Sequence, residues 1–353
     1  MLGHSPAVVG AELESGPSLT RAAFAERTDM QTTVVGNYPK IPNRPRPARL
    51  RQAINRRDRG EITNEELARV GDEVTVEVIQ EQIESGLDIV TDGQVRWDHD
   101  QTYVMRNLAN VEIGALQRYL DTNTYYRQAE IDGAVSWREP ILVRDYLFAV
   151  ENSMKPVKAI ITGPYTLAAL SLDKYYGSRE KLAMALAEEL RNEVEALANA
   201  GARMIQVNDP VIVFNKDDID LFSRALTRML NGVRAETAVY TWFGSADGIL
   251  TALLDLPVDT IGLDFVSGQD NWEAIKSVRF DKNLGAGIVD GRNTRIESLE
   301  QIEESIRRLS QFVPADKIYV NPSCGLGYLP RETAFEKLKR MVQGARRFEP
   351  VAA

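Results

Sequence analysis

The chain has 353 residues, of which 44% are hydrophobic and 26% are charged, a composition typical of a globular protein with a large core. Its net charge of −9 argues against a nucleic-acid-binding or anionic-membrane-binding protein, because both surfaces require a basic footprint. The single cysteine, Cys324, excludes an intrachain disulfide, and no apolar run is long enough to predict a transmembrane helix. We therefore expect a cytoplasmic protein that binds a small molecule.

Residues 1–30 form a polar leader rich in small residues, without the basic and apolar segments of a signal peptide. We predict that this leader is flexible. Met30 lies directly before the first predicted strand, so it is an alternative start to Met1. We expect one domain over residues 31–350.

Short apolar, β-branched runs alternate with helical patterns along this domain, which is typical of a parallel sheet covered on both faces. The predicted strands are residues 32–36, 87–93, 157–163, 202–208, 237–243, 259–265, 284–290 and 317–323. Amphipathic helices are predicted at 63–85, 178–200 and 295–312. The first begins with a capping box of Thr63 and Glu66, and the first two end before Gly86 and Gly201.

These alternating strands and helices predict an α/β fold, a (β/α)8 TIM barrel, with a doubly wound open sheet as the alternative. Residues 94–156 form a long insertion after the second strand, rich in Tyr, Trp and Arg. We expect this excursion to fold over the mouth of the barrel.

Functional residues of such barrels follow the carboxyl ends of the strands. Polar residues stand at nearly all of these ends: Asn37 to Lys40, Asp92 to Asp98, Thr162 to Tyr165, Asn208 to Pro210, Trp242 to Ser245, Asp264 to Ser267, Asp290 to Asn293 and Asn321 to Cys324. Each residue alone could cap a helix or complete a turn. Together they predict a ligand site at this end of the barrel.

The motifs at these ends, taken in chain order, resemble the cobalamin-independent methionine synthase family. They are VVGNYPK (34–40), LDIVTDGQVRWD (87–98), GPYTL (163–167), IQVNDP (205–210), GIVDGRN (287–293) and VNPSCGLGYLP (320–330), and the resemblance covers about residues 32–345. It implies transfer of a methyl group from 5-methyltetrahydrofolate to homocysteine, with zinc holding the thiolate. Family enzymes contain a catalytic barrel and a degenerate copy, and this chain resembles a single barrel with features of both.

The resemblance implies a zinc site of which Asp264 and Cys324 are the matching residues. The family's His-x-Cys pair after the fifth strand corresponds to Trp242 and Gly244, and neither can bind zinc. A catalytic zinc site needs at least three protein ligands. The sequence therefore predicts an incomplete metal site.

The remaining candidate residues also depart from the family pattern. Gln94 and Asn208 stand where the family has two carboxylates near the amino-acid substrate, and Arg292 replaces a histidine. Arginine stays protonated, so Arg292 can clamp an anion but cannot transfer a proton. We interpret His99, within RWDHD, as a solvated loop residue.

Two sets of site residues follow. Catalytic candidates are Asp209, Asp264, Asp290 and Arg292. Substrate-binding candidates are Asn37, Lys40, Gln94, Arg96, Asn208, Trp242 and Ser245. Three functions remain open: a family methyltransferase, a zinc-free enzyme with another substrate, or a non-catalytic barrel that binds a folate-like ligand. The last could act beside a separate catalytic barrel, and a homo-oligomer is also compatible.

Overall fold

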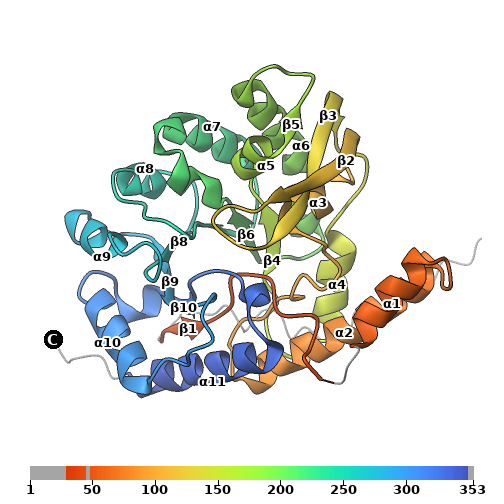
Figure 1. Ribbon diagram of the computed structural model, residues 1–353. Helices are drawn as coiled ribbons and strands as arrows, with labels where there is room; N and C mark the ends of the chain where they lie inside the picture. The colour runs from red at the N-terminus through yellow and green to blue at the C-terminus, as the bar shows by residue number, and fades with distance from the viewer. Residues whose placement is uncertain (1–28, 45–47, 349–353) are drawn as a thin grey trace, which may run out of the picture.

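A curled parallel sheet forms the centre of the molecule (Figure 1). The structure, a computed structural model, describes residues 29–44 and 48–348, so most of the predicted leader lies outside the described residues. Seven strands pair in the order β1-β10-β9-β8-β7-β6-β4. They are β1 (Gln31–Thr32), β4 (Ala159–Thr162), β6 (Met204–Asn208), β7 (Glu236–Tyr240), β8 (Thr260–Asp264), β9 (Asn283–Val289) and β10 (Ile318–Pro322). The predicted α/β fold is confirmed, and the strands follow one another in chain order, without the reversal of a doubly wound sheet.

The segment predicted as a strand at 87–93 lies between β1 and β4 but forms only an isolated bridge, between Val90 and Val157. The backbone amides of Asp88 and Ile89 donate to the carbonyl oxygen of Thr32 at 3.1 and 3.2 Å. On the other side, the Lys158 amide donates to the Val90 carbonyl oxygen at 2.9 Å. Regular pairing ends soon afterwards, because residues 93 and 94 both have positive φ and turn the chain.

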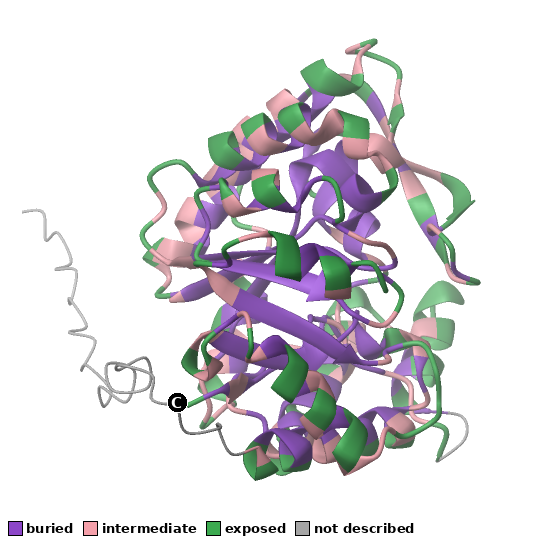
Figure 2. Ribbon diagram, turned by 90° about the vertical axis from the view of Figure 1, so that its left-hand side faces the viewer, coloured by how far each residue is buried: buried purple, intermediate pink, exposed green. Residues whose placement is uncertain are grey.

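Helices surround the sheet, and the strands are buried along most of their length (Figure 2). The helices are α1 (Arg49–Asp58), α2 (Asn64–Glu84), α3 (Asp100–Met105), α4 (Val143–Glu151), α5 (Pro164–Leu170), α6 (Arg179–Asn199), α7 (Ile219–Leu230), α8 (Leu250–Leu254), α9 (Asn271–Ala274), α10 (Leu299–Leu309) and α11 (Arg331–Arg347). Short 3-10 turns lie at Pro210–Phe214, Lys216–Asp218, Ile275–Ser277, Ala315–Lys317 and Leu326–Tyr328. None of the helices in the described ranges is long and apolar enough to cross a membrane.

Local sequence signals explain several helix ends. The predicted capping box of α2 is confirmed, with the Glu66 amide donating to Thr63 Oγ1 at 3.2 Å and the Thr63 amide donating to Glu66 Oε2 at 2.8 Å. Gly86 and Gly201 have φ of +93° and +94°, as expected just after α2 and α6. Helix α10 begins later than predicted, because Ser298 forms its own capping box with Gln301.

The chain between residues 94 and 156 contains α3, a long antiparallel hairpin and α4. The hairpin consists of β2 (Ala109–Arg118) and β3 (Tyr125–Ser136), and β5 (Leu172–Asp173) extends it as a second, three-stranded sheet. Figure 1 shows this sheet beside α3 and α5. Near the hairpin turn, Tyr119 and Tyr126 belong to the same buried cluster as Trp242 and Phe243, which follow β7.

The ring of Tyr240, the last residue of β7, packs closely against β8 and β9. A Cβ added at Gly262 would lie 2.3 Å from the Tyr240 ring, and one added at Gly285 would lie 2.4 Å from the same ring. Glycines at these two strand positions therefore make room for the Tyr240 side chain.

Replacing Gly262 with alanine is expected to lower the free energy of unfolding by about 1–3 kcal/mol, because the added methyl group would displace a buried ring. Urea denaturation measures this difference. Gly71→Ala is the matched control, since Gly71 is inside α2 and its added Cβ would meet only Arg96 Cγ, at 3.8 Å. That control should be neutral or stabilising, and equal losses in both variants would contradict the packing argument.

Candidate functional site

A pocket of about 350 Å³ opens where the chain leaves β1, the Val90 bridge segment and β10. These are carboxyl ends of adjacent parallel segments, the position predicted for a ligand site. The pocket is lined by four segments and one helix residue: Asn37 to Ile41, Gln94 with Trp97 to Asp100, Thr124 and Tyr125, Gly327 to Leu329, and Arg51. The hairpin turn thus forms part of the wall.

Asn37 joins the first and last of the parallel segments. Its side-chain Oδ1 accepts a hydrogen bond from the Gly327 amide at 2.8 Å, and its carbonyl oxygen accepts one from the Leu326 amide at 3.0 Å. A Cβ at Gly325 would lie 2.4 Å from Asn37 Oδ1, so only a glycine at position 325 lets the loop approach Asn37 this closely. Asn37 therefore fixes the loop that carries Tyr328 into the pocket wall.

Gln94 supplies unsatisfied hydrogen-bonding groups to the pocket. The residue is only 3% exposed, yet neither its Nε2 nor its Oε1 has a partner. Gly36 leaves space for this amide, because a Cβ there would lie 3.1 Å from Gln94 Oε1 and 3.5 Å from Asn208 Nδ2. A buried polar group without a partner costs about 1–3 kcal/mol, which a ligand's hydrogen bonds would offset.

Lys40 brings a positive charge to the same pocket. Its Nζ donates a hydrogen bond to the carbonyl oxygen of Trp97. Burial lowers the pKa of Lys40, and the carboxylates of Asp98, Asp100 and Asp92 oppose that shift. Of these groups, Lys40, Asp98 and Asp100 line the pocket, so in their charged forms they would present both signs of charge, as a zwitterionic ligand would require.

His99 also lines the pocket, and the prediction that it is a solvated loop residue is wrong. Its Nδ1 is buried and has no hydrogen-bond partner. The ring packs against Tyr119 at 4.6 Å and Tyr126 at 5.5 Å between centroids. Burial lowers the pKa of His99, so the imidazole is neutral near neutral pH.

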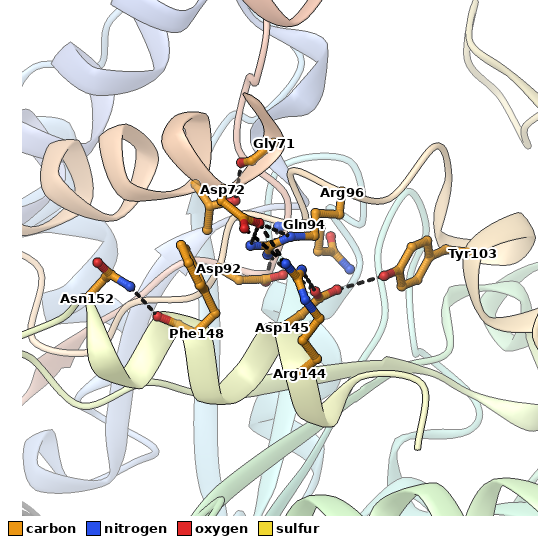
Figure 3. Close-up of polar contacts among 11 residues, drawn as sticks. Gly71, Asp72, Asp92, Gln94, Arg96, Tyr103, Arg144, Asp145, Phe148 and Asn152 are labelled. Atoms are coloured by element: carbon orange, nitrogen blue, oxygen red, sulfur yellow. Dashed lines mark hydrogen bonds and ion pairs between the residues drawn. The ribbon is translucent and has the colours of Figure 1, made fainter. Parts of the chain in front are cut away.

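Arg96 does not line the pocket but belongs to an ion-pair network between α2 and α4 (Figure 3). Its Nε donates to Asp72 Oδ1 at 3.0 Å, and its Nη1 lies 3.3 Å from Asp145 Oδ1. Tyr103 donates to the other oxygen of Asp145 at 2.8 Å. Burial and the neighbouring Asp145 raise the pKa of Asp92 to about 7. The network anchors the loop that presents Gln94 and His99.

Asn208 and Asp209, at the end of β6, form hydrogen bonds within the protein. Asn208 Oδ1 accepts from Gln206 Nε2 at 2.6 Å. The Asp209 carboxylate accepts from the amides of Tyr165 at 3.3 Å and Thr166 at 2.7 Å, at the start of α5. Burial raises the pKa of Asp209 to about 7.

An aromatic cluster occupies the ends of β7 and β10, next to the hairpin. It includes Tyr119, Tyr126, Tyr240, Trp242, Phe243, Cys324 and the half-buried Tyr328. The Arg292 guanidinium lies 4.5 Å from the centre of the Phe243 ring and donates to the Asp121 carbonyl oxygen at 2.6 Å. Arg292 therefore connects the end of β9 to the hairpin turn.

Asp290 and Ser245 lie in turns beside this cluster. Asp290 Oδ1 accepts from the Arg292 amide at 2.8 Å. Ser245 Oγ lies 3.2 Å from Asn271 Oδ1 and accepts from the Asp247 amide at 3.0 Å. Neither residue lines the pocket.

The residues that match the family's zinc ligands do not fit a catalytic zinc site. Asp264 accepts from the amides of Phe243, Val266 and Ser267 at 2.8–2.9 Å, so its oxygens are already engaged. Cys324 is fully buried, and burial raises the pKa of its thiol. Within residues 29–44 and 48–348, no three His, Cys, Asp or Glu side chains are grouped to hold a metal ion.

Gly244, where the resemblance places a zinc-binding cysteine, is closely covered. A Cβ there would lie 2.8 Å from Val213 Cγ2. The neighbouring Trp242 is 4% exposed within the aromatic cluster. Apolar packing thus occupies the space around both positions.

The structure brings Asn37, Lys40 and Gln94 together around one pocket, and adds residues that were not among the individual substrate-binding candidates. These are Trp97, His99, Asp100, Thr124, Tyr125 and Tyr328. The RWDHD run (96–100) was the available signal for the first three, because it begins three residues after the end of the second predicted strand. The hairpin residues carried no such signal.

Comparisons with known proteins agree with this architecture. The sequence model of the family described as "Cobalamin-independent synthase, Catalytic domain" matches residues 30–347. The methionine synthase of Saccharolobus solfataricus is 32% identical over 90% of this chain and 94% of its own length. That of Sulfurisphaera tokodaii is 34% identical over 90% and 92%. The B12-independent methionine synthase of Shewanella sp. W3-18-1, solved with selenomethionine, superposes with a TM-score of 0.78 and 25% identity, over 90% of this chain and 97% of that one.

Proposed function

Because the chain belongs to the cobalamin-independent synthase family, we propose that it transfers a methyl group to a small thiol acceptor bound beside Gln94 and Lys40. Homocysteine is the proposed acceptor and 5-methyltetrahydrofolate the proposed donor. The observation that carries this proposal is the buried, unpartnered amide of Gln94 in a pocket at the strand ends. The relatives named methionine synthase, matched over 94% and 92% of their own length, support the reaction class.

An amino-acid acceptor suits the charges of this pocket. Its carboxylate would meet the Lys40 ammonium, and its ammonium group would meet Asp98 or Asp100. A buried ammonium without a counter-charge is costly, so these carboxylates compensate for the amides at Gln94 and Asn208. The Gln94 amide would then orient the bound acceptor through hydrogen bonds.

No step of the proposed reaction is assigned to zinc. Trp242 and Gly244 cannot bind a metal ion, and Asp264 is engaged by three backbone amides. The methyl acceptor is therefore held by this chain's own side chains. Zinc bound with one ion per chain, and required for turnover, would contradict this part of the proposal.

We also propose that residues 87–91, between β1 and β4, supply the strand that completes a (β/α)8 barrel. Residues 94–156 would then be an insertion after this strand, the second in chain order. Hydrogen bonds to Thr32 on one side and to Pro156 and Lys158 on the other support this assignment. The hairpin would then form one wall of the barrel mouth, through Thr124 and Tyr125.

Methionine formation from homocysteine and methyltetrahydrofolate, measured by mass spectrometry on metal-analysed protein, tests the reaction. Binding of both compounds without turnover would instead favour the non-catalytic barrel. Repeating the assay with a separate catalytic barrel added would show whether such a partner is required. Absence of both binding and turnover would reject the proposed function.

Replacing Gln94 with methionine is expected to weaken acceptor binding at least about 10-fold, the loss of roughly one hydrogen bond. The free energy of unfolding should stay equal or rise, because the Gln94 amide has no partner to lose. Isothermal titration calorimetry and urea denaturation measure the two quantities.

Gln82→Met is the matched control for this prediction. The Gln82 amide is also buried, but it donates to the Thr91 carbonyl oxygen and accepts from the Thr91 amide, both at 3.0 Å. Its loss should therefore lower stability by about 1–3 kcal/mol. If Gln94→Met destabilised the protein as much as Gln82→Met, the unpaired Gln94 amide would not mark a ligand position.

A further inference from the structure

We propose that His99 is the general base that removes the proton from the acceptor's thiol in this pocket. This inference rests on the proposed methyl transfer and adds a residue to it. No motif of the family resemblance assigns a role to His99. It follows from the position of its ring.

A methyl acceptor must be a thiolate, because the thiol itself is a poor nucleophile with a pKa of about 8.5. Zinc-dependent methyl transfer solves this problem through metal binding, which the residues around Asp264 and Cys324 do not support. The proton must then pass to a base near the acceptor. Efficient bases are neutral or anionic groups with a free lone pair at the working pH.

Several other ionisable groups near the strand ends lack these properties, and the Asp98 and Asp100 carboxylates of the pocket are proposed to bind the acceptor's ammonium group. Asp209 and Asp264 accept backbone amides, and neither lines the pocket. Arg292 stays protonated. Lys40 binds the Trp97 carbonyl oxygen and serves better as a counter-charge. His99 is the only histidine in the part of the chain that the structure describes.

The geometry of His99 suits proton transfer. The residue lines the pocket beside Lys40 and Asp100, and no side chain lies within hydrogen-bonding geometry of its Nδ1. Tyr119 packs edge-on against the ring at 4.6 Å, and Tyr126 packs at 5.5 Å. The backbone is held as well, because the His99 carbonyl oxygen accepts from the Tyr103 amide at 3.0 Å. A ring held in this way needs little reorganisation to accept a proton.

The charges around His99 favour a neutral imidazole that can still become protonated. Burial lowers its pKa most, and the Lys40 ammonium from the β1 loop acts in the same direction. Asp100, Gln101 and Asp98, on its own segment, oppose the shift. The hairpin contributes the tyrosine rings. Burial raises the pKa of Asp100, whereas the charges of His99 and Lys40 lower it, so a protonated His99 and an ionised Asp100 would stabilise each other.

The step conserves protons and electrons. The His99 lone pair takes the proton from the S–H group, and the resulting thiolate attacks the methyl carbon of the N-methyl donor. The C–N bond breaks, and its electron pair remains on the donor nitrogen. His99 returns the proton to that nitrogen, so a thiol and an N-methyl amine become a methyl thioether and a secondary amine.

Comparing thiol and selenol acceptors in the His99→Gln variant tests the assignment. The wild type and the variant are assayed with homocysteine and with selenohomocysteine, whose selenol is already ionised near neutral pH. With the thiol, kcat/KM should fall about 10²–10⁴-fold in the variant, the usual contribution of a general base. With the selenol, kcat/KM should change only a few-fold.

The pH profile supplies a second readout. In the wild type, kcat/KM for the thiol should fall at low pH as His99 becomes protonated, and this limb should be absent from His99→Gln. Imidazole added to His99→Ala should restore part of the thiol reaction. Circular dichroism and acceptor binding confirm that the variants are folded.

The outcomes separate the two proposals. Equal losses with thiol and selenol, or no loss with either, would overturn the role of His99 while leaving methyl transfer intact. A wild type that methylates neither acceptor would overturn the proposed function, and the general base with it.

Discussion

Replacing Arg96 with methionine is expected to lower the free energy of unfolding by about 3–5 kcal/mol, the cost of removing one partner from a buried ion pair. The side chains of Arg96 and Asp145 are only 9% and 5% exposed, and Arg96 also binds Asp72 (Figure 3). Methionine keeps the approximate length of the side chain but leaves Asp145 buried without this cation. Urea denaturation of the two proteins measures the difference.

Arg144→Met is the matched control for this prediction. Arg144 contacts the same two carboxylates, Asp72 and Asp145, but its side chain is 56% exposed. Exposed ion pairs contribute about 0–1 kcal/mol, so this variant should be only slightly destabilised. Equal losses from Arg96→Met and Arg144→Met would show that burial does not govern the strength of the network.

Burial of Lys158 is expected to make the free energy of unfolding depend on pH. This residue is 2% exposed, its Nζ donates to the Val34 carbonyl oxygen at 2.7 Å, and burial lowers its pKa to about 7. Between pH 7 and about 10.4, the usual lysine value, the unfolded chain therefore binds more protons at this residue than the native protein does. Stability from Lys158 must rise with pH across that window.

The difference in unfolding free energy between wild type and Lys158→Met isolates this contribution from other titrating groups. From pH 7 to pH 9, the free energy of unfolding of the wild type should rise by roughly 2 kcal/mol relative to that of Lys158→Met. Urea denaturation at several pH values measures this change. Lys276→Met serves as control, because Lys276 lies on the surface with its side chain 44% exposed. A pH-independent difference for Lys158→Met would mean that Lys158 titrates normally.

Hydrophobic periodicity predicted most of the central sheet, because each parallel strand is covered on both faces and is apolar throughout. The end of strand pairing in segment 87–93 could not be predicted, since its apolar run does not reveal that Gly93 and Gln94 adopt positive φ. The long hairpin of β2 and β3 was not predicted as strands. Many of its positions are exposed and polar, so the alternation of apolar and polar residues that predicts a strand is weak there.

The site was predictable only where backbone position determines side-chain position. Asn37 and Lys40 follow a strand directly, and they line the pocket as expected. Arg96 follows another strand, but its direction is set by Asp72 and Asp145, 24 and 49 residues away in sequence. The surroundings of His99 depend on Tyr119 and Tyr126 from the hairpin, a pairing that no local pattern encodes.

The close packing of Val213 against Gly244 determines how easily a metal-binding residue could be introduced there. A cysteine at position 244 would meet Val213, and a histidine at position 242 would replace a packed indole. Introducing a metal-binding pair at these positions would thus require several coordinated substitutions. Evolution from this sequence is therefore expected to refine the existing pocket, and engineering of zinc dependence should begin by enlarging the space at Val213.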